Sequence, residues 1–142
     1  MRQIILDASA ILAFFAPDAT PQQQDYANHI VENMVNHHLT ARVPPLWDYE
    51  IANSLIVLRR KKLINEKQAV HIRADLRQLP IRIAHHEGNL IEAITPIAQT
   101  YHLSAYDAAY LELAMRLDTP VATLDKNLQA AAQKADFFFS GK

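Results

Sequence analysis

Four acidic residues of this chain stand out because each lies beside apolar sequence at the start or end of a predicted element. Asp7 and Asp125 directly follow short apolar runs, and Glu50 and Asp107 lie in helical sequence with apolar neighbours. Carboxylates that are held together without basic partners repel one another, so a divalent cation is their natural counter-charge. The sequence therefore offers Asp7, Glu50, Asp107 and Asp125 as candidate metal-binding and catalytic residues.

The chemistry expected of such a group is hydrolysis assisted by a metal ion. Hard carboxylate oxygens suit Mg²⁺ or Mn²⁺, and Mg²⁺ keeps several waters, one of which can become the attacking nucleophile. A second ion, recruited by a substrate phosphate, could stabilise the leaving oxygen. No His, Lys or Ser nucleophile is required. The sequence leaves open whether one ion or two would bind.

Each acid also has a purely structural interpretation. Asp7 and Asp125 could be N-caps of the helices that follow them, and Asp107 could complete a capping box with Ser104. Glu50 could be a helix acid that reaches solvent. Caps are common, so each acid alone is a weak indication of a site. The predicted topology gathers strand ends at one edge, and the four acids together therefore favour a site.

The elements that would position these acids alternate between apolar strands and amphipathic helices, which is typical of a doubly wound α/β fold. Strands are expected at Gln3–Leu6, Thr40–Val43, Ile81–Ala84, Val121–Leu124 and Phe137–Phe139. Helices are expected at residues 9–15, 21–38, 44–62, 65–79, 88–102 (bent or split at Pro96), 104–116 and from 126 onward. The first strand is apolar throughout, which favours a central strand of a parallel sheet covered on both faces. Ligands bind such sheets where strands end and helices begin.

Composition limits the remaining possibilities. The 142 residues suit one domain, 1–142, and the absence of cysteine excludes disulfides and thiolate chemistry. With 2 glycines there is no phosphate-binding glycine loop, and a net charge of −1 gives no general basic field for nucleic acid. Asp7 interrupts the N-terminal apolar run, which argues against a signal peptide, and no run reaches membrane-spanning length. We expect a cytosolic protein with no membrane partner.

The four acids lie in stretches that resemble the acidic motifs of a known family. The stretches are residues 4–9 (IILDAS), 47–53 (WDYEIAN), 103–110 (LSAYDAAY) and 122–127 (ATLDKN). In order and spacing they resemble the motifs of PIN-domain ribonucleases, and in particular of the VapC-type toxins of bacterial toxin–antitoxin pairs. The resemblance covers nearly the whole chain, and the third stretch is the most specific.

The resemblance implies a fold, an activity and a set of roles. It implies an α/β fold with a central parallel sheet of about five short strands, the Asp7 strand in the middle, and helices on both faces. It also implies hydrolysis of RNA phosphodiester bonds with Mg²⁺ or Mn²⁺, a cognate antitoxin protein and a homodimer. Asp7, Glu50, Asp107 and Asp125 would bind metal, and Ser9, Asn53 and Thr123 would orient them.

Other functions fit less well. Haloacid-dehalogenase-type hydrolases carry a second Asp two positions after the first, where this chain has Ser9. A receiver domain carries an acid pair just before the strand-end Asp, where this chain has Ile5 and Leu6. The more serious rival is a non-catalytic PIN-like module that binds RNA or protein without cutting. The presence of all four acids favours the enzyme.

Three further features have open interpretations. The basic run Arg59–Lys62 could bind RNA phosphates, or it could complement the C-terminus of its helix. Tyr106 and Tyr110 could stack on bases, although packing beside the helix is the simpler interpretation. The histidines at 37–38 and 85–86 are better explained by polar loop or helix-end positions than by metal binding, because adjacent residues seldom face one ion.

Overall fold

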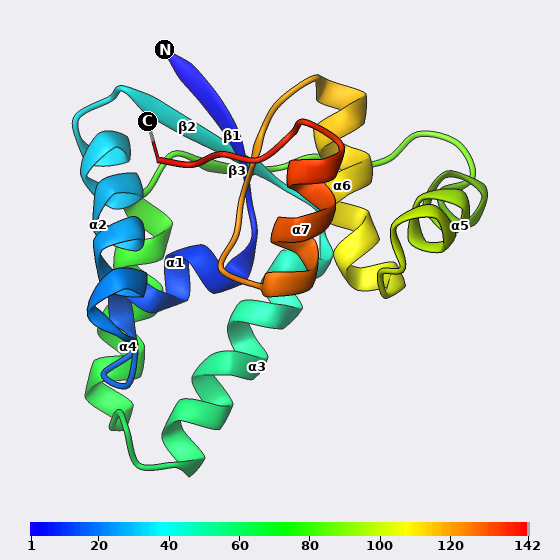
Figure 1. The fold of residues 1–142 in the computed structure, drawn as a ribbon. Coiled ribbons are helices and arrows are strands. Elements are labelled where there is room, and N and C mark those ends of the chain that lie inside the picture. The colour runs from blue at the N-terminus through cyan, green and yellow to red at the C-terminus, as the bar shows by residue number, and fades with distance from the viewer. Residues whose placement is uncertain (142) are drawn as a thin grey trace.

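The computed structural model describes residues 1–141. Its strands are β1 (Arg2–Leu6), β2 (Leu39–Val43), β3 (Ile81–Ile83) and β4 (Val121–Ala122). Its helices are α1 (Ala8–Phe15), α2 (Pro21–Val35), α3 (Leu46–Arg60), α4 (Glu66–Gln78), α5 (Leu90–Tyr101), α6 (Ala105–Leu117) and α7 (Lys126–Lys134). Figure 1 shows these elements in chain order, with both ends of the chain on the same side of the molecule.

The four strands form one sheet in the order β3-β2-β1-β4, and all pairs are parallel. The expected parallel sheet with the Asp7 strand in its interior is therefore confirmed. Ile4, Ile5 and Leu6 are all 0% exposed, which explains why β1 is apolar on both faces. Because the strands are parallel, the segments that follow β1, β2 and β4 leave the sheet at the same edge.

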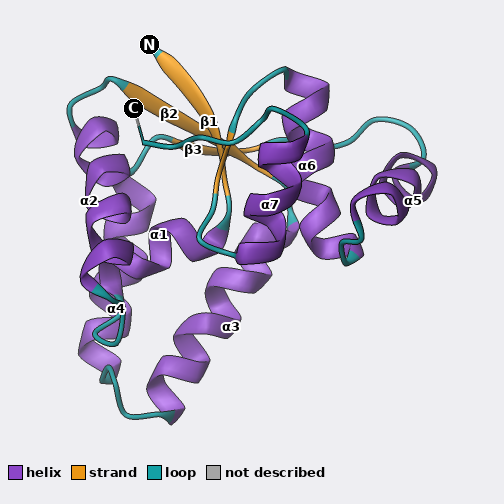
Figure 2. Cartoon of the chain, viewed as in Figure 1, coloured by secondary structure: helices purple, strands orange, loops and turns teal. Residues whose placement is uncertain are grey.

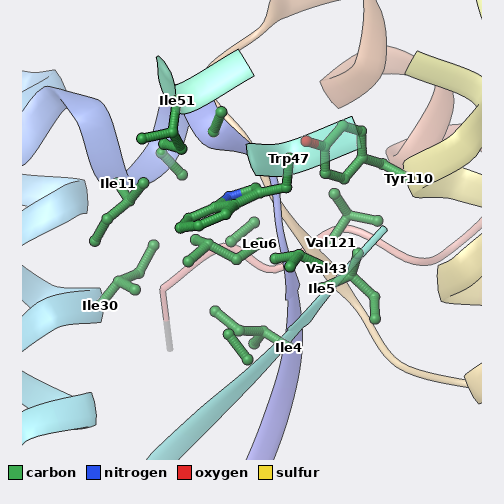
Figure 3. Packing of buried hydrophobic residues seen from close by; sticks show 14 of the residues in the cluster. Ile4, Ile5, Leu6, Ile11, Ile30, Val43, Trp47, Ile51, Tyr110 and Val121 are labelled. Carbon is green, nitrogen blue, oxygen red and sulfur yellow. The ribbon is translucent and has the colours of Figure 1, made fainter. Parts of the chain in front are cut away.

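Helices lie on both sides of the strands, as expected. In Figure 2, α1, α2 and α4 lie on one side and α5, α6 and α7 on the other, while α3 extends away from the sheet. The main core joins the two inner strands to these helices. Figure 3 shows the Trp47 ring of α3 above Leu6, with Ile11 of α1 on one side of the ring and Tyr110 of α6 on the other. None of the helices in residues 1–141 combines the length and apolarity that a membrane span needs.

The sheet differs from the expectation of about five strands. Phe137–Phe139 is not a strand: it makes one isolated bridge, between Phe138 and Val121. β4 is also shorter than expected, because the chain leaves the ladder after Ala122. The amide of Leu124 donates to Ser9 Oγ and that of Asp125 donates to Thr123 Oγ1, both at 3.0 Å. These amides are thus bound to side chains at the edge where β1 ends.

Helix boundaries follow local capping. Ser104 Oγ accepts the amide of Asp107 at 3.1 Å and starts α6, and Asn65 and Gln68 form a full capping box on α4. The helix expected at 21–38 ends earlier, at Val35, because His37 adopts a left-handed conformation with φ of 61°. α5 continues through Pro96 as one helix, so the expected break there is absent.

Candidate active site

All four candidate acids lie at the edge of the sheet where β1 and β4 end. Asp7 directly follows β1 and Asp125 begins α7 after β4, while Glu50 lies on α3 and Asp107 in the first turn of α6. The negative charges are close enough to act on one another. The charges of Asp7, Asp107 and Asp125 all raise the pKa of Glu50, and those of Asp125 and Asp7 raise that of Asp107. The fold therefore brings the four predicted carboxyls into one group, which we call the acid cluster.

Asp7 is the most buried member of the acid cluster. Its side chain is 5% exposed, and its Oδ2 accepts hydrogen bonds from Ser9 Oγ at 2.6 Å and Thr123 Oγ1 at 2.7 Å. Burial raises the pKa of Asp7, and the two hydroxyl donors oppose that rise. Although Asp7 occupies the N-cap position of α1, its side chain makes no capping hydrogen bond there. Its carboxylate is held instead by the hydroxyls of Ser9 and Thr123.

Glu50 has a partner that the sequence did not reveal. The hydroxyl of Tyr110, on α6, donates a hydrogen bond to Oε1 of Glu50 on α3. Burial is the main cause that raises the pKa of Glu50, and the bond from Tyr110 opposes it. Burial and this bond also raise the pKa of Tyr110, so that the phenol stays protonated and donates. One signal was available in the sequence: Tyr110 lies one helical turn after Asp107.

Asp107 and Asp125 can be compared directly with their capping interpretations. Asp107 accepts no bond from the backbone of Ser104 within the described chain, so only half of the expected capping box forms. Burial and the charge of Asp125 raise the pKa of Asp107 to about 6. Asp125 does cap α7, because its Oδ2 accepts the amide of Leu128 at 2.9 Å. Asp125 therefore both caps a helix and contributes a carboxylate to the acid cluster.

Asn53 is the predicted residue that the structure does not bring into the network. It lies on α3, one turn after Glu50, with its side chain exposed. Across residues 1–141, no hydrogen bond joins Asn53 to any member of the acid cluster. An orienting role for Asn53 thus has no geometric support from the protein alone.

The donor set of the acid cluster fits a hard divalent cation. Asp7, Glu50 and Asp125 each have one carboxylate oxygen that accepts a hydrogen bond. Among the described residues, no side chain donates a hydrogen bond to the second carboxylate oxygen of any of these three acids. In the same part of the chain, no Lys, Arg or His forms an ion pair with any of the four. No three His, Asp or Glu side chains already converge on one coordination point in residues 1–141. Mg²⁺ needs only one or two direct carboxylates, because it retains waters.

Comparison with known proteins decides the family. The family model for the PIN domain matches residues 4–134, which is most of the chain. The chain belongs to the PIN-domain family. The resemblance seen in the four acidic stretches is confirmed, and the parallel sheet described above is the sheet of a PIN domain.

Two relatives and one solved structure place this PIN domain more closely. Ribonuclease VapC3 of Pyrobaculum aerophilum is 27% identical over 127 residues, which cover 89% of this chain and 92% of that protein. Ribonuclease VapC1 of Mycobacterium tuberculosis is 31% identical over 134 residues, 92% of each chain. The crystal structure of PAE2754 from Pyrobaculum aerophilum is 19% identical, with a TM-score of 0.67 over 92% of this chain and 79% of that one. This last likeness shows the fold alone.

Proposed function

We propose that this PIN domain is a divalent-metal-dependent endoribonuclease that hydrolyses RNA phosphodiester bonds. The observation that carries the proposal is the acid cluster: four carboxyls from four segments lie close enough at one sheet edge for their charges to interact, and none has a basic partner in residues 1–141. Like charges gathered in this way destabilise the protein unless a cation offsets them. The names of the relatives, both ribonucleases, support RNA as the substrate.

The residues of the acid cluster have separable tasks in this proposal. Asp7, Glu50, Asp107 and Asp125 would hold Mg²⁺ or Mn²⁺, and Ser9 and Thr123 keep the Asp7 carboxylate in one orientation. When bound, the cation supplies charge stabilisation for the phosphate and lowers the pKa of water. Asp125, fixed as the cap of α7, cannot turn away from the group without losing its bond to Leu128.

The reaction balances without a covalent enzyme intermediate. A water oxygen bonds to phosphorus, and the bond between phosphorus and the 3′ oxygen breaks. One water proton ends on the leaving 3′ oxygen, and the other is lost to solvent from the new 5′-phosphate. The products are therefore a 5′-phosphate end and a 3′-hydroxyl end.

A cleavage assay on total cellular RNA tests this proposal. Purified protein is incubated with Mg²⁺, with Mn²⁺ or with EDTA, and the new ends are identified by their reactivity with kinase and ligase. We expect cleavage with either metal, none with EDTA, and 5′-phosphate ends. Asp107→Asn, prepared in parallel, controls for contaminating nucleases. Undiminished cleavage in EDTA, or 2′,3′-cyclic phosphate ends, would remove the metal-dependent mechanism.

The alternative is a PIN-like module that binds RNA or protein without cutting it. The same assay separates the two functions when RNA binding is measured beside cleavage. Binding without cleavage under any metal condition would favour the module. All four acids are present, and their negative charges repel one another. A module that only binds would gain nothing from this repulsion, so the presence of all four acids favours the enzyme.

We further propose that the protein is the toxin of a type II toxin–antitoxin pair and acts as a homodimer. The support is similarity to two proteins named VapC. A small antitoxin would bind over the acid cluster and could place an Arg or Lys among the carboxylates, which lack a cationic partner in residues 1–141. Purification from its own cells at native levels should recover a stoichiometric small protein. Recovery of the chain by itself would favour a stand-alone nuclease.

A further inference from the structure

Tyr110 carries a polar hydroxyl into the main hydrophobic cluster of the core. Its side chain is 0% exposed, and it packs in the main core with residues of the strands. Figure 3 shows its hydroxyl directed at α3, the helix that carries Trp47. A phenylalanine would fill the same space without a polar atom. The hydroxyl therefore carries a cost of burial that its hydrogen bond must offset.

That hydrogen bond ends on a member of the acid cluster. The acceptor is Oε1 of Glu50, and within residues 1–141 no other side chain donates to this carboxylate. Glu50 also has no ion-pair partner in the same residues. A glutamate side chain has three rotatable bonds, so without a partner it would spread over several rotamers. The hydroxyl of Tyr110 selects one of them.

The bond also joins two helices that each carry an acid of the cluster. Tyr110 and Asp107 lie one turn apart on α6, so they point from neighbouring positions on one side of that helix. Glu50 belongs to α3. A rigid aromatic ring thus links the helix of Asp107 to the carboxylate of Glu50, and the distance between the two acids depends on that link.

We propose that Tyr110 is a positioning residue, which holds the Glu50 carboxylate in place for a divalent cation through the hydrogen bond from its hydroxyl. The inference rests on the proposed function for the presence of a cation, but the hydrogen bond itself does not depend on it. Tyr110 acts through Glu50 and leaves Oε2 of that residue for the ion. Removal of a comparable supporting hydrogen bond costs about 10- to 100-fold in metal affinity.

A double-mutant cycle on Mn²⁺ affinity tests the proposal. Mn²⁺ is titrated into the full chain, and free Mn²⁺ is followed by electron paramagnetic resonance for wild type, Tyr110→Phe, Glu50→Gln and the double variant. We expect Tyr110→Phe to weaken binding about tenfold or more. The double variant should bind no more weakly than Glu50→Gln, because a residue that acts through Glu50 has nothing left to position.

Thr119→Val is the matched control. It also removes a hydroxyl inside the protein, one that donates to the backbone carbonyl of Leu117 at 2.9 Å. We expect it to lower stability while leaving Mn²⁺ affinity within about twofold of wild type. Tyr110→Phe with wild-type affinity would overturn the proposal. Tyr110→Phe that weakens Mn²⁺ binding equally in wild type and in the Glu50→Gln background would also overturn it, because the loss would then reflect a general effect on the fold.

A measurement on wild type keeps the proposal testable if Tyr110→Phe does not fold. A wild type that binds no Mn²⁺ would overturn the proposal. The hydroxyl proton of Tyr110 should appear in proton NMR as a slowly exchanging, downfield signal that moves in Glu50→Gln. A rapidly exchanging hydroxyl would overturn the proposal. RNA cleavage is scored separately: a cycle that behaves as expected in a protein that cuts no RNA would reject the nuclease and retain the role of Tyr110.

Discussion

Thr123 donates a 2.7 Å hydrogen bond to Oδ2 of Asp7 across a sequence separation of 116 residues. Both side chains are buried, at 1% and 5% exposure. Hydrogen bonds to charged acceptors are stronger than neutral ones, and a buried acceptor that loses its donor keeps the full cost of burial. The pair therefore links two adjacent strand ends and also stabilises the carboxylate form of Asp7.

The first prediction concerns that hydroxyl. Thr123→Val keeps the shape of the side chain and removes the donor, so we expect the free energy of unfolding to fall by about 1.5–3 kcal/mol. Urea denaturation in EDTA near neutral pH measures the change. The control is Thr119→Val, another buried threonine, whose hydroxyl donates to the carbonyl of Leu117 at 2.9 Å. Thr123→Val should also weaken Mn²⁺ binding and Thr119→Val should not; equal effects of both on Mn²⁺ would contradict the assignment.

The second prediction separates the metal site from helix capping. Asp107→Asn removes one negative charge from the acid cluster, so in EDTA the variant should melt at or above the temperature of wild type. Mg²⁺ at a hundredfold excess over Kd should stabilise wild type by about 2.7 kcal/mol. The variant should gain clearly less and should cleave no RNA. Thermal melting of each protein, with EDTA and with Mg²⁺, supplies the measurement.

Asp48→Asn is the matched control for that comparison. Asp48 is also an acid in the first turn of a helix, α3, but it is exposed. Its variant should respond to Mg²⁺ as wild type does. Equal Mg²⁺ shifts for wild type, Asp48→Asn and Asp107→Asn would remove Asp107 from the metal site.

The third prediction is a dependence on pH. The folded protein raises the pKa of Asp107 from 3.8 to about 6, so the folded state binds this proton more tightly than the unfolded state does. The resulting stabilisation is complete below the unfolded value and is lost as pH rises through 6. Wild type in EDTA should therefore lose stability relative to Asp107→Asn between about pH 4 and pH 7. Mn²⁺ affinity should rise over the same pH range, because the Asp107 carboxyl must lose its proton before it can bind the cation. A stability difference that stays constant with pH would contradict the shift.

The fourth prediction concerns the basic end of α3. Arg59 forms an ion pair with Glu66, whereas Arg60, Lys61 and Lys62 are exposed. Figure 1 shows this end of α3 far from the strands. Helix geometry places it about 15 Å from Glu50. If these three residues bind phosphates, changing them to Gln should reduce the slope of log affinity for RNA against log salt by about 0.7 for each phosphate no longer bound.

That measurement uses the Asp107→Asn background, in which the RNA should stay intact. Arg59→Gln is the control, because the carboxylate of Glu66 already engages its guanidinium. An unchanged salt slope in the triple variant would leave the basic run as a complement to the end of its helix.

The sheet edge was predictable because it depends on local patterns. Apolar runs of strand length precede Asp7 and Asp125, and parallel pairing then fixes which ends meet. Strand β2 follows the same logic and leads through Pro44 and Pro45 into α3. Strand lengths were less predictable. Val121–Leu124 has the composition of a four-residue strand, but Ser9 and Thr123 bind the amides that would have extended the ladder.

The hydrogen bond between Tyr110 and Glu50 was not predictable from spacing alone, and a comparison of two pairs shows why. Asn53 follows Glu50 by three residues, and Tyr110 follows Asp107 by three residues. Three residues rotate a helix by about 300°, so the second side chain lies about 60° from the first. On α3 that offset leaves Asn53 in solvent, whereas on α6 it turns Tyr110 into the core. What lies opposite each face decides the outcome, and it is known only once the helices are packed.

The pairing of β1 with β4 determines when the acid cluster can be completed during synthesis of the chain. Synthesis proceeds from the N-terminus, so β1, α3 and α6 all leave the ribosome before Thr123 and Asp125. The 2.7 Å hydrogen bond from Thr123 to Asp7 therefore cannot form until the 116 residues that follow Asp7 have been synthesised. A nascent or prematurely terminated chain that ends before Thr123 carries three of the four acids but has neither β4 nor α7 to close the edge of the sheet. If the protein cleaves RNA as proposed, such a chain should be inactive, and activity should arise only after translation has passed Asp125.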